Sequence, residues 1–340
     1  MSNKIKIIFL VIRDEAPSTR FRVLQHIPEL EKFNFDMTIK RIPKDFYSRL
    51  KLFNSLSSYD IVFLQKRLFQ WWALWYIRRK SKMLIYDFDD AVLFRNSGNF
   101  YSASRYRRFR NTMKYSDIVI AGNHYLRDLA MRFTKHVVVI PTGINTRTYL
   151  PKSSPVYAPP FTIGWIGSKS NLMLLRQLIE PINALHRETG NFRFKIVCDD
   201  FIDGFECPVE KKVWTEQEEV KDIQSFDIGI MPSTENQWTR GKCALKLLQY
   251  MSCGIASVAS FTDVTAHIVK DGVNGFLASG DEAWLEKLRF LLKNPDHLSA
   301  MGTEARKSLL GSYDSETVAS QYAKVFQDAR PPRNTRPPRF

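Results

Sequence analysis

The segment that says most about chemistry is residues 240–254, with the sequence RGKCALKLLQYMSCG. Gly241 and Gly254 bracket a run with a strong helical pattern, so we expect a helix over residues 241–252. In such a helix Lys242, Lys246 and Gln249 fall at i, i+4 and i+7 and therefore share one face. The segment thus predicts a helix that presents two amines and an amide on a single side.

Arg240 and Lys242 stand together at the N-terminus of this expected helix. That end of a helix carries about half a positive charge, and a cation there typically loses about 0.3–1 kcal/mol. The arrangement becomes favourable when an anion such as a phosphate is bound. The alternative interpretation is a solvated basic turn without a ligand.

Two strand-to-helix turns are further candidates. Gly167, Ser168 and Lys169 follow a predicted strand over 161–166; a glycine permits close backbone approach, and the serine and lysine are suited to contact a phosphate. The first strand, 4–12, leads into a loop where Ser18 or Thr19 caps a helix whose first turn carries cations. These cations are Arg20 and Arg22. Ligands bind beyond the carboxyl ends of strands in open parallel sheets, so both turns are expected to border a ligand. The alternative for the loop after the 4–12 strand is an ordinary capped surface helix.

A buried strand ends in Tyr86-Asp87-Phe88-Asp89-Asp90. Such a carboxylate pair is suited to hold Mg²⁺ or Mn²⁺ with a nucleotide diphosphate. The competing interpretations are an acid–base role for Asp87 or Asp90 toward an acceptor hydroxyl, and helix capping by Asp89 or Asp90. We favour the acid–base role and expect no bound metal.

Residues 68–80 and 101–110 interleave aromatic and basic side chains, which is typical of contact with an anionic membrane surface. The alternatives are core packing and a solvated basic face. Single-stranded nucleic acid also binds such surfaces, but no nucleic-acid-binding motif accompanies them, and we expect no nucleic-acid partner.

Continuous apolar runs alternate with helical segments along the whole chain. Strands are expected at 4–12, 35–42, 61–65, 83–88, 118–122, 137–141, 161–166, 192–198, 226–231 and 255–259, and helices at 18–32, 123–133, 171–189 and 241–252. Runs without polar alternation indicate strands buried on both faces, and therefore parallel sheets. The expected fold is α/β, with two doubly wound Rossmann-like domains that face each other across a cleft.

The 340 residues suit two domains, with 44% hydrophobic residues and a net charge of +15 that favours anionic partners. No apolar run is long enough to span a bilayer. The four cysteines form no C-x-x-C pair, which suits reduced thiols in a cytosolic protein. We expect a first domain over 1–145, a linker over 146–160 and a second domain over 161–312. A C-terminal helix over 313–328 is expected to pack on the first domain, followed by a disordered basic tail over 329–340.

The stretch Leu245–Ser260, followed by Asp271-Gly272-Val273-Asn274-Gly275-Phe276-Leu277, resembles the donor domain of retaining nucleotide-sugar glycosyltransferases with the GT-B fold. Residues 18–22, 63–66, 86–90 and 139–143 resemble the bacterial polysaccharide-assembly branch of that family. The resemblance spans roughly residues 4–328.

The resemblance implies metal-independent transfer of a sugar from a nucleotide diphosphate-sugar, with retention of configuration. Basic side chains then stabilise the departing diphosphate. On this basis Arg240 and Lys246 are candidate catalytic residues together with Asp87. The donor-binding candidates are Gly167, Ser168, Lys169, Glu235, Lys242, Gln249, Asn274 and Gly275, and those on the acceptor side are Arg20, Arg22 and Asp90.

The chain also departs from the family pattern. The family's paired glutamates fall at Gly241 and Gln249, its glutamate before the D-G-x-N-G-F segment falls at His267, and its arginine after the second-domain strand falls at Ser168. We expect a cytoplasmic glycosyltransferase at the inner face of the plasma membrane that acts on a lipid-linked glycan in surface polysaccharide synthesis. The alternatives are a soluble acceptor, and a nucleotide-binding protein without turnover.

Overall fold

The computed structural model describes residues 4–13, 16–95, 101–153 and 157–329. The chain divides into two compact units, each of which is described by itself. The first contains Met1–Gly143, Asn236–Cys243 and Ser315–Phe340, and the second contains Ile144–Glu235 and Ala244–Asp314. The basic tail from residue 330 onward, for which disorder was expected, and residues 154–156 of the expected linker lie outside the described residues.

The first unit is built on a six-stranded parallel sheet in the order β2-β1-β3-β4-β5-β6. Its strands are β1 (Ile5–Val11), β2 (Phe35–Arg41), β3 (Ile61–Gln65), β4 (Met83–Phe88), β5 (Ile118–Ala121) and β6 (Val137–Val139). The central strands β3 and β4 are buried along their whole length, which explains their unbroken apolar sequences.

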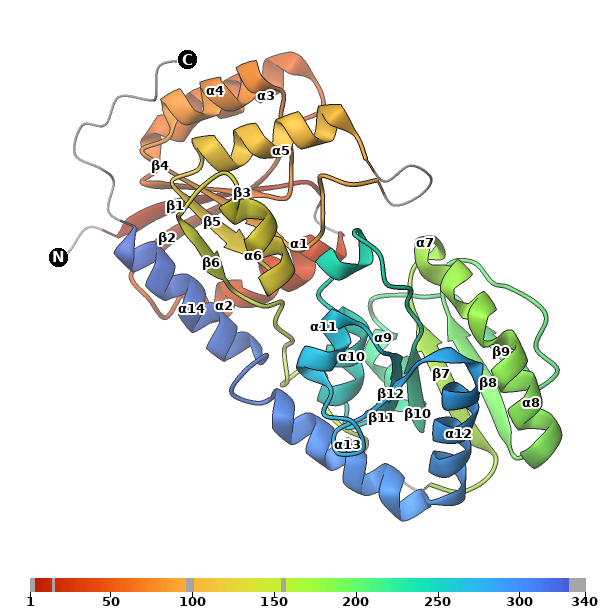
Figure 1. The fold of residues 1–340 in the computed structure, drawn as a ribbon. Helices are drawn as coiled ribbons and strands as arrows, with labels where there is room; N and C mark the ends of the chain where they lie inside the picture. Colours follow the sequence, from red (N-terminus) through yellow and green to blue (C-terminus); the bar gives the residue numbers. More distant parts are fainter. Residues whose placement is uncertain (1–3, 14–15, 96–100, 154–156, 330–340) are drawn as a thin grey trace. The chain divides into compact units, whose positions relative to one another are not determined.

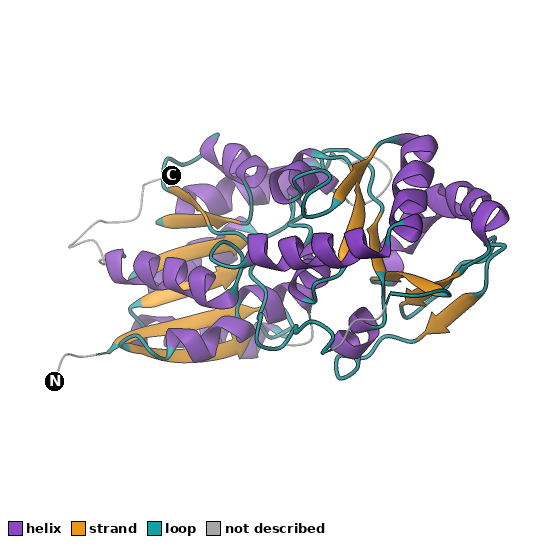
Figure 2. Cartoon of the chain, turned by 90° about the horizontal axis from the view of Figure 1, so that it is seen from below, coloured by secondary structure: helices purple, strands orange, loops and turns teal. Residues whose placement is uncertain are grey.

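Helices cover both faces of this sheet (Figures 1 and 2). They are α1 (Pro17–Arg22), α2 (Ile27–Leu30), α3 (Phe46–Ser55), α4 (Trp71–Lys80), α5 (Ala103–Tyr115), α6 (His124–Met131) and α14 (Ser315–Asp328), with the 3-10 turns η1 (Leu24–His26), η2 (Leu56–Ser58) and η4 (Thr239–Gly241). Helix α14 comes from the end of the described chain and packs beside α2 and η1 (Figure 1). Its Tyr322 and Phe326 enter the same core as Phe9 and Phe63, so a distant segment completes the first unit.

The second unit holds another six-stranded parallel sheet, in the order β12-β11-β10-β7-β8-β9. Its strands are β7 (Phe161–Ile166), β8 (Phe192–Val197), β9 (Val209–Lys212), β10 (Ile228–Met231), β11 (Ala256–Ser260) and β12 (Phe276–Ala278). Gly164 and Gly229 lie opposite each other in β7 and β10. A Cβ atom on Gly164 would come within 2.1 Å of the Phe226 ring, and one on Gly229 within 2.6 Å of the Tyr250 ring. Both glycines therefore make room for an aromatic ring against the sheet.

The helices of the second unit are α7 (Lys169–Leu172), α8 (Ile179–Thr189), α9 (Glu219–Gln224), α10 (Leu245–Ser252), α11 (Asp263–Ile268), α12 (Gly280–Lys293) and α13 (Pro295–Leu309), with the 3-10 turn η3 (Met173–Leu178). Helices α8, α12 and α13 pack with strands β7, β8 and β10–β12 in one large apolar core.

The expected α/β class with parallel sheets in two Rossmann-like units is confirmed. Three expected helices differ from the structure. The segments expected as single helices over 18–32 and 171–189 are divided by the 3-10 turns η1 and η3. The helix expected over 241–252 begins only at Leu245. Gly241 ends η4, and Ala244 has a left-handed backbone with φ of 48°. Lys242 precedes the helix, so it does not share a helix face with Lys246 and Gln249. Among the described residues, no helix has both the length and the apolar character needed to cross a membrane.

Candidate functional site

The carboxyl ends of β10, β11 and β12 border a pocket of about 240 Å³ in the second unit. Its polar lining includes Ser233 after β10, Ser260 at the end of β11, and Ser279 with Asp281 after β12. The Ser233 N–H donates to Ser260 Oγ at 2.9 Å, which ties two of these strand ends together. Open parallel sheets bind their ligands at this edge. Sequence analysis did not single out these residues, although their positions directly after strands were a usable signal.

The neighbouring strand β7 ends at a turn that contacts α10. A Cβ atom on Gly167 would come within 2.8 Å of Lys246 Cε and 2.5 Å of the Trp165 ring. The Lys246 ammonium lies 5.5 Å from the centre of that ring. The structure therefore brings Gly167 and Lys246 together at the carboxyl edge of the second sheet, where a glycine leaves room for the Trp165 ring. A cation held over a small turn at this edge is suited to a phosphate.

Ser168 and Lys169 follow Gly167 but have other contacts. The Ser168 hydroxyl lies 3.0 Å from that of Ser170. Lys169 is an exposed cation whose Nζ lies 2.7 Å from Asp200 Oδ2, and the hydrogen bond with this carboxylate raises the pKa of Lys169. The Lys169 ammonium has three N–H donors, so it can contact a phosphate while it stays paired with Asp200.

Three other donor-binding candidates face the interior of the second unit. Gln249 is buried, and its Nε2 donates to the Tyr149 hydroxyl at 3.5 Å. Asn274 is buried and ties its loop together: its Oδ1 accepts from the Lys270 N–H at 2.7 Å and its Nδ2 donates to Ser308 Oγ at 2.9 Å. The Gly275 carbonyl accepts from the Gly272 N–H within the same loop. These contacts give the three residues structural roles. Glu235, by contrast, is exposed in the loop after β10.

Arg240 and Lys242 belong to the first unit. The Asn123 side-chain amide donates to the carbonyls of Arg240 at 3.1 Å and Lys242 at 2.9 Å. The Arg240 guanidinium lies 4.8 Å from the centre of the Tyr125 ring, and the Lys242 ammonium lies 4.0 Å from the centre of the Trp238 ring. Burial lowers the pKa of Lys242 to about 8. The nearby Lys66 cation also lowers this pKa, whereas the Asp90 carboxylate acts to raise it.

Lys66 is a further functional candidate, which the sequence analysis named only within a family-like stretch. It follows β3 with a left-handed φ of 55°. Its Nζ donates to Ser18 Oγ at 2.9 Å, lies 3.3 Å from Asp89 Oδ1 and pairs with Asp90. Burial would lower the pKa of Lys66, but the two carboxylates outweigh it and raise the pKa above its usual value. Asp90, assigned to the acceptor side, thus stands in a charged cluster at the carboxyl ends of β3 and β4.

Two other acceptor-side candidates differ in their surroundings. Arg20 is half-buried, with its guanidinium 5.0 Å from the centre of the Phe21 ring. Arg22 and Asp87 have no exposed side-chain surface and form an ion pair inside the first unit. The structure does not place Arg22 or Asp87 where an acceptor could touch it, which corrects the expected direct roles of both.

The D-x-D segment does not gather its carboxylates around one point. Asp87 faces Arg22, whereas Asp89 faces Lys66. Across the part of the chain that the structure describes, no three His, Cys, Asp or Glu side chains are grouped as metal ligands.

Residues 160–294, which make up most of the second unit, match the family model described as "Glycosyl transferases group 1". A search of the curated proteins gives no match.

Solved structures share the fold over nearly the whole chain. HepE of Anabaena, solved in complex with UDP and glucose, is 16% identical with a TM-score of 0.72, over 95% of this chain and 99% of that one. Sucrose-phosphate synthase of Thermosynechococcus elongatus is 13% identical with a TM-score of 0.68, over 95% and 98%. The lipopolysaccharide outer core galactosyltransferase WaaB is 15% identical with a TM-score of 0.65, over 95% and 100%. The second unit is thus similar to group 1 glycosyl transferases, and the whole chain has the GT-B fold, with two Rossmann-like units, that these solved structures share.

Proposed function

We propose that this protein is a retaining glycosyltransferase that moves a sugar from a nucleotide diphosphate-sugar to a lipid-linked glycan during surface polysaccharide synthesis. It would act without a metal, in the cytoplasm at the inner face of the plasma membrane, and without a nucleic-acid partner. The observation that carries the proposal is the contact of Lys246 with Gly167 and Trp165 at the carboxyl edge of the second sheet, in the unit that matches the glycosyltransferase model.

In this proposal the second unit binds the donor. The Lys246 ammonium lies near the diphosphate and stabilises the negative charge that develops as the sugar departs. The pocket of Ser233, Ser260 and Asp281 takes a polar part of the donor, since its hydroxyls and carboxylate are suited to the hydroxyl groups of a ribose or a sugar. HepE, which has the same fold, was solved with UDP, and this supports a nucleotide as the ligand.

Within the second unit, Lys169 adds a further exposed cation beside Gly167. In the first unit, Arg240 remains a candidate catalytic cation and Lys242 a candidate donor-binding cation. The Lys66 cluster, with Asp89 and Asp90, would face the acceptor. Retention of configuration and metal independence rest on the family resemblance described above.

The experiment is an incubation of the purified protein with UDP-, GDP-, ADP- and CMP-linked sugars and a bacterial lipid extract. Expected are nucleotide release from one donor class and a glycosylated lipid whose new bond keeps the donor's anomeric configuration by NMR. Lys246→Ala should lower the turnover by about tenfold or more, because one electrostatic contact to a developing anion is removed. Inversion would overturn the retaining mechanism, and a water-soluble product alone would overturn the lipid acceptor.

The second candidate is a nucleotide-binding protein without turnover. It is favoured by one observation: Gln249 stands where the resemblance implies a glutamate, and it is buried against Tyr149. Nucleotide binding without release of sugar or nucleotide from any donor would establish this alternative.

A further inference from the structure

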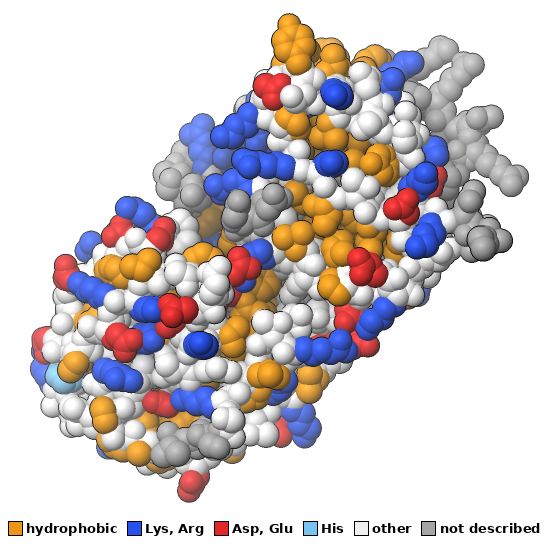
Figure 3. All heavy atoms as spheres, turned by 180° about the vertical axis from the view of Figure 1, so that it is seen from behind, with side chains coloured by type: hydrophobic (Ala, Val, Ile, Leu, Met, Phe, Trp, Pro, Cys, Tyr) orange, Lys and Arg blue, Asp and Glu red, His pale blue; other side chains and the backbone are white. Residues whose placement is uncertain are grey.

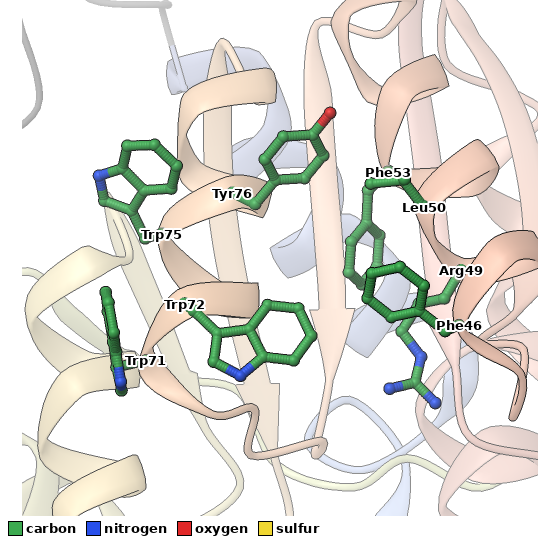
Figure 4. Close-up of a pocket in the computed structure, with 8 residues that line it drawn as sticks. All are labelled: Phe46, Arg49, Leu50, Phe53, Trp71, Trp72, Trp75 and Tyr76. Atoms are coloured by element: carbon green, nitrogen blue, oxygen red, sulfur yellow. The ribbon is translucent and has the colours of Figure 1, made fainter.

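Helices α3 and α4 border an apolar groove of about 520 Å³ on the first unit (Figure 4). All four aromatic residues of α4 line it from one side, and Phe46, Leu50 and Phe53 of α3 line it from the other. We call it the α3–α4 groove. Its volume falls within the range of about 300–1,000 Å³ that is typical of ligand pockets.

Buried side chains form the floor of the groove, and exposed side chains form its rim. Phe53 is 1% exposed and packs against Phe69, with ring centres 5.7 Å apart. At the rim, Trp71 is 59% and Phe46 55% exposed, and Trp72 is 39% exposed. Phe46 and Trp72 approach each other across the opening, with ring centres 6.2 Å apart (Figure 4). Exposed aromatic groups in one patch mark a binding surface.

The helices around the groove carry only positive charge. Two Lys and Arg residues lie on α3, three on α4 and five on α5, and these helices contain no Asp or Glu. Helix α5 packs against α4, and its Arg107, Arg110 and Lys114 are exposed at spacings that share one helix face. Figure 3 shows a cluster of basic side chains beside apolar ones on the upper part of the face seen there.

The combination of exposed aromatic and basic side chains favours an anionic membrane over a second copy of the chain as the binding partner. A second copy of the chain would bring the same cations face to face, and like charges across an interface oppose association. An anionic membrane satisfies both features, because its headgroups are negative and its chains are apolar. Tryptophan and tyrosine favour the membrane interface, and each Lys or Arg near an anionic surface contributes about 1 kcal/mol.

We propose that the first unit docks on an anionic membrane through α3, α4 and α5, with a lipid hydrocarbon chain entering the α3–α4 groove and headgroup phosphates facing the cations of α5. The inference rests on the proposed function in one respect: docking brings the enzyme to a lipid-linked acceptor. It adds the surface, the lipid class and the residues that bind it.

The test is co-sedimentation of the full-length protein with vesicles of phosphatidylcholine alone and with one-third phosphatidylglycerol. Binding should require the anionic lipid. The double variant Trp71→Ala/Trp72→Ala should weaken binding by about tenfold or more, since it removes two large interfacial side chains. The matched control is Phe261→Ala, a residue of the second unit that is 58% exposed, and it should bind as the native protein does.

The charge contribution is tested separately. Arg107→Gln/Arg110→Gln/Lys114→Gln should weaken binding to the anionic vesicles by about tenfold or more. Lys221→Gln/Lys293→Gln/Lys307→Gln removes the same charge from exposed positions of the second unit and should leave binding unchanged. Equal losses in the two triple variants would overturn the proposed surface, because net charge alone would then explain binding. Thermal unfolding of each variant reports whether it is folded.

Entry of a lipid chain into the α3–α4 groove is tested with vesicles whose acyl chains carry bromine, which quenches tryptophan fluorescence on contact. Quenching should occur in the native protein and fall strongly in Trp71→Phe/Trp72→Phe/Trp75→Phe, which replaces every tryptophan of α4 and keeps the aromatic surface. Vesicle binding without quenching would overturn chain entry. Concentration-dependent self-association that the tryptophan variants abolish, without vesicle binding, would assign the groove to a second copy instead.

This inference and the proposed function fail in different measurements. Nucleotide-induced thermal shifts are recorded without lipid, and they should be unchanged in the groove and α5 variants. If no nucleotide shifts the unfolding temperature of the native protein, this would contradict the proposed function and would not affect the lipid result.

Discussion

Arg22 and Asp87 form an ion pair that is completely closed to solvent, with both side chains 0% exposed. The Arg22 guanidinium donates to both carboxylate oxygens, and also to the Ile140 carbonyl at 2.7 Å. The Tyr322 hydroxyl of α14 donates to the same carboxylate at 3.0 Å. Burial would lower the pKa of Arg22, but Asp87 outweighs it and raises that pKa. The pair thus joins α1, β4 and α14 inside the first unit.

We therefore predict that Arg22→Met destabilises the first unit, because it leaves a buried carboxylate without its cation. Removal of one partner from a buried pair costs about 3–5 kcal/mol, whereas an apolar pair of similar volume is often neutral. Urea unfolding should show a loss of this size, partly restored in Arg22→Met/Asp87→Leu. Arg20→Met, in the same helix, is the control and should change stability little. Unchanged stability in Arg22→Met would contradict the structural role.

His26 provides a pH-dependent link between η1 and α14. Its Nδ1 lies 3.1 Å from the Ser315 carbonyl oxygen, and the side chain is buried. Burial, with the Arg22 charge as a second cause, lowers the pKa of His26 to about 4. The unfolded chain binds the proton below about pH 6.5 while the folded protein does not, so stability falls as the pH drops from 6.5 to 4.

The loss attributable to His26 approaches about 1.4 kcal/mol per pH unit within that window. His26→Phe removes the titrating group and keeps an aromatic ring beside Tyr322, so its unfolding free energy should depend less on pH between 6.5 and 4. His136→Phe replaces an exposed histidine of the same unit and serves as the control. Parallel pH profiles for His26→Phe and the native protein would contradict this account.

Much of the fold could be predicted because its strands are contiguous apolar runs. Residues 61–65 and 161–166 form the strands expected from them. The start of α10 could not be predicted from local pattern. A Cβ on Gly241 would come within 2.5 Å of the Ala91 backbone. The Asn123 side-chain amide donates hydrogen bonds to the carbonyls of Arg240 and Lys242. Tertiary contacts thus override a segment with good helical propensity.

The candidate site was predictable to a similar degree. Gly167 and Lys246 could be expected at one sheet edge, because Gly167 lies in a strand-to-helix turn and Lys246 lies in the first turn of the helix that follows β10. The burial of Arg22 and Asp87 could not, since the two residues are 65 positions apart and Tyr322 closes the pair from 235 positions beyond Asp87. The same holds for Lys66, whose left-handed backbone carries no sequence signal such as a glycine.

Lys66→Met should lower glycosyl transfer by about tenfold or more, because Asp89 and Asp90 lose the cation that holds them at the strand ends. Nucleotide affinity should be unchanged, since Lys66 is not among the proposed donor-binding residues. The comparison is kcat and the nucleotide Kd measured on the same sample. Lys82→Met breaks an exposed lysine–aspartate pair with Asp60 in the same unit and should retain transfer. A weaker nucleotide Kd in Lys66→Met would place Lys66 with the donor instead.

Chelation should leave transfer intact. In the proposed mechanism protein cations, Lys246 among them, supply the positive charge that a metal would otherwise bring to the diphosphate. Initial rates measured with EDTA and with added Mg²⁺ or Mn²⁺ should agree within about twofold. Loss of activity in EDTA that Mn²⁺ restores would overturn metal independence.

The most direct test of the donor site is a thermal-shift series with UDP, GDP, ADP, CMP and their common sugar conjugates, repeated with Lys246→Ala. Lys221→Ala, an exposed lysine of the same unit, is the matched control. We predict that nucleotides of one base stabilise the native protein and Lys221→Ala, and that the shift is lost in Lys246→Ala. Equal stabilisation of Lys246→Ala and the native protein, or no stabilisation by any nucleotide, would contradict a donor site at Gly167 and Lys246.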